Sequence, residues 1–317
     1  MASSQKIEDQ IMALKQSSEQ DRNHAISAAL SSRSNVVITQ AAQLAAHHRC
    51  HETVPHLAAA FQRLMQPDAI KRDKGCLGKT AIIKALFDLD FADEEFYSEA
   101  LGYSQFEAVW GDQEDVASEI RATAALGFVA TNPWRAIFRL IEVLNDPESQ
   151  VRIAAARAIG SLGSDAAEAV LRQKALAGDH APDVTGECFS ALLDSFADDA
   201  PGFVAHFLHD KDGMIRDLAA FALGSSKIPS AIDELKRCWD EAGLRPDLRE
   251  SLIQGLALAC TEHAFLALFE IMKHDGTSEI QVVRALAIYR HDERIRKDVE
   301  SRVSANSRRI FDEEWND

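Results

Sequence analysis

Hydrophobic residues between positions 149 and 180 predict a pair of short amphipathic helices joined by a tight turn. Val151, Ala155 and Ile159 recur at steps of four residues, which places them on one face of a helix. A glycine-containing turn follows, and Asp165 is expected to cap a second helix that ends at the next glycine. The residues expected to face inward from this second helix are Ala169, Val170 and Leu176. Because two short helices cannot cover their own apolar faces, the pair needs neighbours of the same kind.

The same helical pair recurs along the chain. The last large aliphatic residues of the successive first helices are Leu44, Leu86, Leu126, Ile159, Leu192, Leu223, Leu256 and Ile288. Their spacing is 31 to 33 residues in the second half and 40 to 42 residues at the start. A period of this size with two helices per unit is typical of an α-solenoid. We therefore expect an all-α fold of about eight two-helix repeats, with essentially no β-sheet.

Short sequence matches accompany this period, and they resemble the HEAT-repeat family, especially the short repeats typified by phycobilisome lyases. The residues that carry the resemblance are Asp146, Pro147, Val151, Arg152, Ala155 and Gly160. The resemblance covers about residues 35–302 and implies a right-handed superhelix whose second helices line the concave face. It specifies the architecture more than the function, since HEAT-like repeats serve as scaffolds, lyase subunits and a few enzymes.

The domain organisation follows from the repeats. Residues 1–34 are expected to form N-terminal capping helices or a tail, and residues 35–302 the solenoid. Residues 303–317 form a charged ending, which is a candidate for a C-terminal cap. The side chains expected to build that cap are Phe311 and Trp315.

The formal net charge of −16 argues against a nucleic-acid partner, because phosphate backbones are bound by clustered Lys and Arg. Five cysteines without a CxxC pair indicate reduced thiols, which favours a cytoplasmic protein. The sequence has no apolar run of the roughly 20 residues that a membrane span needs. We expect no membrane association and no cofactor.

Residues 88–119 depart most from the repeat pattern. They contain eleven Asp and Glu residues, no Lys or Arg, and several aromatic residues. One interpretation is a longer second helix and a loop whose aromatic side chains cover the edge of the solenoid. The other is an acidic and aromatic patch that docks a basic protein partner. The candidate binding residues in this segment are Glu94, Glu95, Glu99, Tyr103, Trp110 and Asp112.

Cationic residues on the second helices suggest a second candidate surface. They are Arg135, Arg139, Arg172, Lys174, His206, His209, Lys236 and Arg237. A basic groove of this kind would suit an acidic peptide or the propionates of a tetrapyrrole. The alternative is that solvated helix faces simply carry charges.

The first helices carry arginines in similar positions. These are Arg121, Arg152, Arg216 and Arg249. The family resemblance implies that they pair with acidic residues at the joints between repeats. Exposed pairs of this kind are each worth less than about 1 kcal/mol, so we expect them to set register rather than stability.

Two motifs are weak on inspection. His47 and His51 have the i, i+4 spacing of two metal ligands, but Pro55 suggests that the helix has already ended, and a third ligand is not identifiable. Gly78-Lys79-Thr80 is similar to the end of a phosphate-binding loop, but Asp73 occupies the position of its first glycine. A helix that begins near Leu77 explains this segment better.

Three functions follow from these patterns. The first is a non-enzymatic scaffold that binds another protein or a peptide. The lyase resemblance implies an alternative, a subunit that handles a bilin chromophore. A metal-dependent oxygenase similar to deoxyhypusine hydroxylase would need repeated His-Glu pairs, and the chain contains only His51-Glu52.

Overall fold

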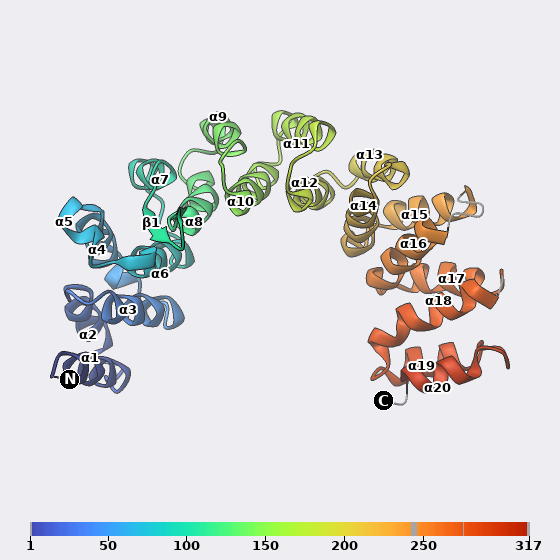
Figure 1. Ribbon diagram of the computed structural model, residues 1–317, viewed down its shortest axis with the longest axis horizontal. Coiled ribbons are helices and arrows are strands. Elements are labelled where there is room, and N and C mark those ends of the chain that lie inside the picture. The colour runs from blue at the N-terminus through green and yellow to red at the C-terminus, as the bar shows by residue number, and fades with distance from the viewer. Residues whose placement is uncertain (1, 242–245, 275, 316–317) are drawn as a thin grey trace. The chain divides into compact units, whose positions relative to one another are not determined.

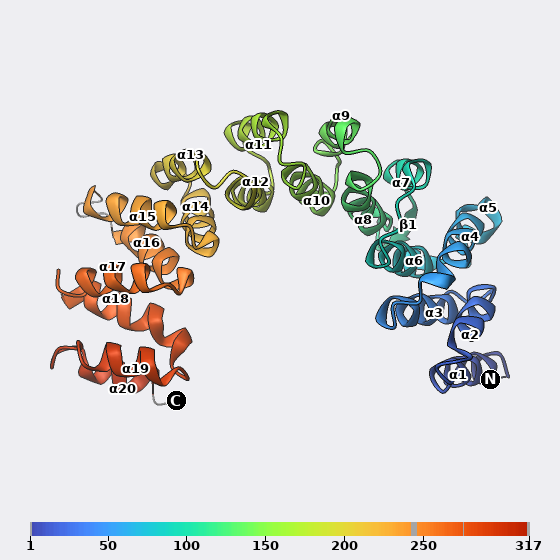
Figure 2. The same cartoon turned by 180° about the vertical axis from the view of Figure 1, so that it is seen from behind.

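A computed structural model describes residues 2–241, 246–274 and 276–315 of the chain (Figure 1, and from behind in Figure 2). The chain divides into two compact units, Met1–Leu162 and Gly163–Asp317. Both consist of antiparallel helical pairs, and within the described ranges the strands are confined to one two-stranded hairpin. The predicted α-solenoid is confirmed.

Unit 1 contains ten α-helices and the hairpin. The elements are α1 (Ala2–Lys15), α2 (Arg22–Leu30), α3 (Asn35–His47), α4 (Val54–Met65), α5 (Pro67–Ile70), α6 (Leu77–Asp88), α7 (Glu94–Leu101), β1 (Phe106–Val109), β2 (Asp112–Asp115), α8 (Ser118–Val129), α9 (Pro133–Val143) and α10 (Ser149–Gly160). The first helices α3, α6, α8 and α10 contact one another in sequence and form one layer, while α4, α7 and α9 form the other. Within this unit the first helices lie on the inside of the bend (Figure 1). The expectation that second helices line the concave face is therefore wrong here, because the Ala- and Gly-rich first helices pack more closely.

Unit 2 repeats the arrangement. Its helices are α11 (Asp165–Ala177), α12 (Pro182–Ser195), α13 (Ala200–Ala205), α14 (Gly213–Ser226), α15 (Pro229–Glu241), α16 (Pro246–Ala259), α17 (Glu262–Ile271), α18 (Gly276–Leu286), α19 (Glu293–Glu300) and α20 (Arg308–Trp315). The first helices α12, α14, α16 and α18 again contact their neighbours in order. The unit ends in α20, where Phe311 and Trp315 are buried and the indole Nε1 donates to Val283 O at 3.0 Å. Residues 316 and 317 of the expected charged ending lie outside the described residues.

The apolar face predicted for the first helix of residues 149–160 is confirmed, since Val151, Ala155 and Ile159 are fully buried. Two details of the second helix are wrong. Ser164, not Asp165, is its N-cap, and the Ser164 side chain accepts a hydrogen bond from Ala167 N. The buried residues are Ala167, Leu171 and Ala175, a stripe at four-residue steps, whereas Ala169 and Leu176 are exposed and Val170 is half-buried.

The last predicted anchor, Ile288, is also misplaced. Helix α18 ends at Leu286, which is fully buried, and a short 3-10 turn follows over Ala287–Tyr289. This turn changes the helical phase, so Ile288 points to solvent and is exposed. The register of the final repeat is therefore set by Leu286.

Candidate functional site

Residues 88–119 fold as the short helix α7 followed by the hairpin β1–β2. The strands pair antiparallel from Phe106 opposite Asp115 to Val109 opposite Asp112. Trp110 and Gly111 form the turn, and Gly111 has a φ of +83°, a conformation that glycine adopts without strain. The expectations of a longer helix with a loop, and of essentially no sheet, are wrong in this segment, because a two-residue turn closes a regular strand pair.

The hairpin separates the aromatic residues of this segment into two groups. Phe96 and Tyr97 are buried beside Phe91, with ring centroids 5.3 to 6.1 Å apart. Phe106 is 63% exposed, and Trp110 at the turn is fully exposed. The first group supports the solenoid edge, and the second is presented to solvent.

The base of the hairpin is fixed by a buried arginine. Arg121 Nη1 donates to Asp115 Oδ2 at 2.7 Å and to Tyr103 O at 3.0 Å. Its Nε and Nη2 donate to the two carboxylate oxygens of Asp146 at 2.7 and 2.9 Å. The Asp115 carboxylate also accepts from Gln105 N and Ala117 N, both at 3.0 Å. One guanidinium therefore joins both ends of the hairpin to the next repeat, a bidentate geometry that Arg supports and Lys does not.

A second buried ion pair is linked to the first through Gln105, which donates to Asp115 and to the Asp73 carbonyl. Lys79 Nζ lies 3.0 Å from Asp73 Oδ2, and both side chains are completely buried. Asp73 also accepts from Gly78 N at 2.8 Å and Lys79 N at 3.1 Å, while Gln105 Nε2 donates to Asp73 O at 3.2 Å. Lys79, which belongs to the part of this segment that is similar to a phosphate loop, and Asp73, which replaces that loop's first glycine, thus neutralise each other in the interior. We call the set Asp73, Lys79, Gln105, Asp115, Arg121 and Asp146 the hairpin anchor.

The pKa shifts of these groups follow from burial and pairing. Burial alone would raise the pKa of Asp115, but the amides of Ala117 and Gln105 and the Arg121 guanidinium outweigh it and lower that pKa. Burial opposes the charge of Arg121, yet Asp146 and Asp115 raise its pKa further. Burial raises the pKa of the Cys76 thiol to about 12. Asp115 and Arg121 are therefore a permanent ion pair at neutral pH.

The predicted acidic and aromatic candidates do not all lie on one surface. Glu94 and Glu95 are exposed in the first turn of α7, and Asp112 is exposed beside the hairpin turn. Glu99 accepts a hydrogen bond from Gln62 Nε2 at 2.7 Å. The hydroxyl of Tyr103 donates to Gln105 Oε1 at 2.7 Å, so Tyr103 belongs to the hairpin support and not to the exposed group.

The cationic candidates on the second helices are mostly neutralised locally. Ion pairs join Arg139 to Glu142, Arg172 to Glu168, Lys174 to Asp179, Lys236 to Asp240, and Arg237 to Glu234 and Glu241. Arg135 is exposed on α9, and His206 and His209 are exposed in the 3-10 turn after α13. These residues form charged helix faces with both signs, not a continuous basic groove.

The histidine pair of the first repeat is separated by the end of its helix. His47 is the last residue of α3, and His51 begins a 3-10 turn. Among the described residues, no group of three or more His, Cys, Asp or Glu side chains is placed to hold a metal ion. None of the described helices has the length and apolar character of a membrane span.

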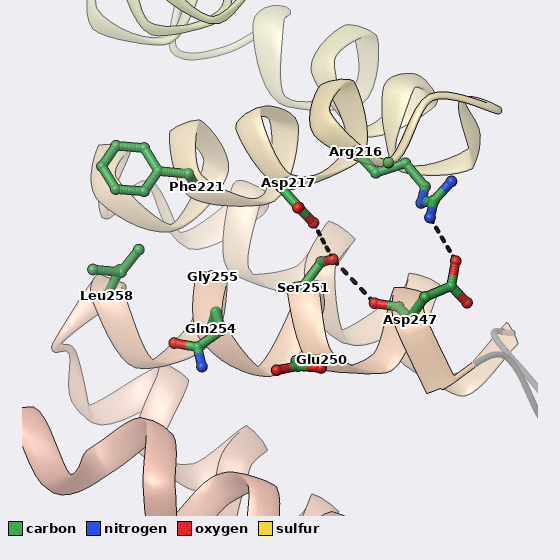
Figure 3. A pocket seen from close by; sticks show the side chains of 10 residues that line it. Arg216, Asp217, Phe221, Asp247, Glu250, Ser251, Gln254, Gly255 and Leu258 are labelled. Atoms are coloured by element: carbon green, nitrogen blue, oxygen red, sulfur yellow. Dashed lines mark hydrogen bonds and ion pairs between the residues drawn. The ribbon is translucent and has the colours of Figure 1, made fainter.

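Two exposed apolar features were missed by the sequence reasoning. Trp134, Phe138 and Ile141 form an exposed stripe along α9, at helical spacing. Phe221 on α14 is half-exposed and lines a groove of about 560 Å³ between α14 and α16 (Figure 3). An aromatic residue at a position that the repeat pattern assigns to the polar face is the signal that would have found both.

A comparison with known protein families agrees with this architecture. Residues 112–193 match the family model of HEAT repeats. No curated protein sequence matches the chain. The solved structures that are similar to it include these three. Human deoxyhypusine hydroxylase in complex with glycerol shares 17% identity over 80% of this chain and 96% of that one, with a TM-score of 0.31.

The complex of CpcE and CpcF of phycocyanin lyase from Nostoc shares 17% identity, covers 93% of each chain, and has a TM-score of 0.35. An engineered protein shares 14% identity over 98% of this chain and 99% of its own, with a TM-score of 0.36. Residues 112–193 therefore match HEAT repeats, and the paired helices of both units give the chain the architecture of an α-solenoid.

Proposed function

We propose that the chain is a non-enzymatic scaffold that binds a protein partner through the hairpin. The binding residues are Trp110 at the turn and Val109, Asp112 and Glu114, which share one face of the strand pair; we call them the hairpin surface. The observation that carries this proposal is the full exposure of Trp110 at the tip of a hairpin whose base is held by buried charges.

The chemistry of the hairpin surface suits a partner segment that is basic and partly apolar. A few buried residues carry most of the binding energy of a protein interface, and Trp is among the residue types enriched there. The neighbouring carboxylates would steer a basic partner toward the tip. Because the anchor already orders the hairpin, little conformational entropy remains to be lost on binding.

The chromophore alternative required a basic groove on the second helices. Arg139, Arg172 and Arg237 are instead paired with neighbouring carboxylates, so nothing in the arrangement favours it. We also place the protein in the cytoplasm as part of this proposal. All five cysteines are free thiols, which suits a reducing compartment.

The test is affinity capture with the tagged full chain from cells that produce it, read by quantitative mass spectrometry. The wild type should retain a partner in stoichiometric amount. Trp110→Ala, and separately Asp112→Lys with Glu114→Lys, should lose it.

The matched control is Trp134→Ala, which removes another exposed tryptophan of the same unit and should retain the partner. Full retention by Trp110→Ala, or capture of nothing above background by the wild type, would contradict the proposal.

A further inference from the structure

Unit 2 contains a groove on its first-helix layer that is separate from the hairpin surface. It lies between α14 and α16 and has a volume of about 560 Å³. One wall is formed by Arg216, Asp217 and Phe221 of α14 (Figure 3). The other is formed by residues of α16, and these are Asp247, Glu250, Ser251, Gln254, Gly255 and Leu258. We call it the α14–α16 groove.

One end of this groove is acidic. Asp217, Asp247 and Glu250 supply three carboxylates, and Arg216 is the cation that lines it. The Arg216 guanidinium is already engaged, since Nη2 lies 2.5 Å from Asp247 Oδ2 and Nη1 donates to the Asp210 carbonyl at 3.0 Å. Asp217 accepts a hydrogen bond from the Ser251 hydroxyl, which fixes its carboxylate (Figure 3). The acidic end therefore carries a net negative charge that suits a cationic group.

The other end is apolar and is shaped by two glycines. A Cβ on Gly224 would lie 1.9 Å from Gly255 O, and a Cβ on Gly255 would lie 2.6 Å from Ala220 O. The two helices can therefore approach this closely only because both residues lack a side chain. Above this contact, Phe221 is 52% exposed and faces Leu258 across the groove (Figure 3). A half-exposed Phe beside a Leu forms a small apolar surface next to the carboxylates.

The spacing of the two ends defines a ligand. Asp217 and Phe221 are four residues apart on one helix, which is a rise of about 6 Å. In an extended peptide, side chains two residues apart point to the same face and are separated by about 6.6 Å. A basic side chain and an apolar side chain at positions i and i+2 would thus reach the carboxylates and Phe221 together.

We propose that the α14–α16 groove binds an extended peptide segment of a partner protein that carries Lys or Arg two residues from a large apolar residue. Charge complementarity with the three carboxylates selects the basic residue, and Phe221 with Leu258 selects the apolar one. This site goes beyond the proposed role of the hairpin and does not depend on it, because its residues all lie in unit 2.

The experiment is NMR titration of the isotope-labelled full chain with short synthetic peptides. The probe is a seven-residue Gly/Ser peptide with one Lys and one Leu two positions apart. Amide signals of α14 and α16 should shift, with a Kd of about 1 mM or below. Three control peptides replace Lys by Glu, replace Leu by Ser, or place Lys and Leu next to each other, and each should bind at least about tenfold more weakly.

Variants locate the site. Asp217→Asn combined with Glu250→Gln keeps the shape of the groove and the Ser251 hydrogen bond, and should weaken the affinity for the Lys-containing peptide about tenfold. Phe221→Ala should weaken the same affinity. Asp240→Asn, which removes a carboxylate outside the groove, and Trp110→Ala should leave the affinity unchanged.

Three results would overturn the proposal: equal affinity for the Lys and Glu peptides, shifts centred outside α14 and α16, or no shifts at millimolar peptide. Loss of partner capture by Trp110→Ala with intact peptide binding would separate the two sites. If the hairpin proposal fails, the peptide titration therefore still tests the α14–α16 groove.

Discussion

Arg121 in unit 1 and Arg216 in unit 2 occupy the same place in their repeats, each after an isoleucine at the start of a first helix. Arg121 pairs with Asp115 and Asp146, whose side chains are only 8% and 11% exposed. Arg216 pairs with Asp247, which is 59% exposed. The same repeat position therefore holds a buried charge network in one unit and, in the other, an ion pair between an 11% exposed arginine and an exposed carboxylate.

The difference shows what the inserted hairpin does. It covers the arginine, adds Asp115 as a second carboxylate, and excludes water from both pairs. For Arg216, whose partner Asp247 is exposed, the family-based expectation that these arginines only set register stays a prediction. For Arg121 we expect a larger effect on stability, because breaking a buried pair leaves an uncompensated charge.

The largest expected effect is that of Arg121→Met. The substitution leaves Asp115 and Asp146 buried without their cation, so unit 1 should lose about 3 to 5 kcal/mol of unfolding free energy. Arg216→Met is the matched control and should cost about 1 kcal/mol or less. Urea unfolding followed by circular dichroism measures both. Equal losses would show that burial by the hairpin does not distinguish the two arginines.

The next effect concerns the glycine contact of unit 2. Gly224→Ala places a Cβ 1.9 Å from the Gly255 carbonyl oxygen, so α14 and α16 must separate. Overpacking of this kind should cost about 1 to 3 kcal/mol, measured by thermal unfolding. Gly202→Ala, whose Cβ would meet nothing within 4 Å, is the control and should not destabilise the protein. If Gly224→Ala left the thermal stability unchanged, this would contradict the close approach of α14 and α16.

A smaller effect is expected from pH. The pKa of Asp115 is lower in the folded protein than in the unfolded chain. Its carboxylate therefore contributes fully to the free energy of unfolding above the unfolded pKa of about 3.9, and this contribution is lost as the pH falls through the folded pKa. The free energy of unfolding of unit 1 should therefore decrease below about pH 4. Asp115→Asn should be less stable at neutral pH and should show a shallower loss in acid. If the free energy of unfolding changed with pH equally in the wild type and in Asp115→Asn, this would contradict the prediction.

The smallest effect is a difference in the rates at which cysteines are alkylated. Cys76 is fully buried beneath the hairpin with a raised pKa, whereas Cys260 in unit 2 is exposed. Iodoacetamide should modify Cys260 first, and Cys260→Ser should remove that fast phase. Arg121→Met should accelerate modification of Cys76 but not of the buried Cys188 of unit 2. Rapid alkylation of Cys76 in the wild type would show that the hairpin is not closed.

The repeat architecture was predictable because it depends on the local periodicity of apolar residues along each helix. The buried face of Val151, Ala155 and Ile159 and the helix that begins at Leu77 follow from spacing alone. The errors occur where local signals compete. Ile288 was misassigned because a 3-10 turn changes the helical phase, and Ser164 outcompetes Asp165 as the cap by one position.

The site was less predictable, because it depends on contacts between repeats. The sequence singled out residues 88–119 and Trp110, but no local pattern links Arg121 to both Asp115 and Asp146, which lies 25 residues away. The α14–α16 groove likewise needs Asp217 and Ser251 to meet across 34 residues. The stacking of neighbouring repeats brings Arg121 to Asp146 and Asp217 to Ser251.

The most direct test of the central claim, that buried charges hold the hairpin as a rigid platform for Trp110, is hydrogen–deuterium exchange of the full chain. The wild-type amides of β1 and β2 should be protected to an extent comparable with those of α8. In Arg121→Met the hairpin amides should lose protection while those of α16 do not. Exchange of the wild-type hairpin amides as fast as in an unstructured loop would contradict the account.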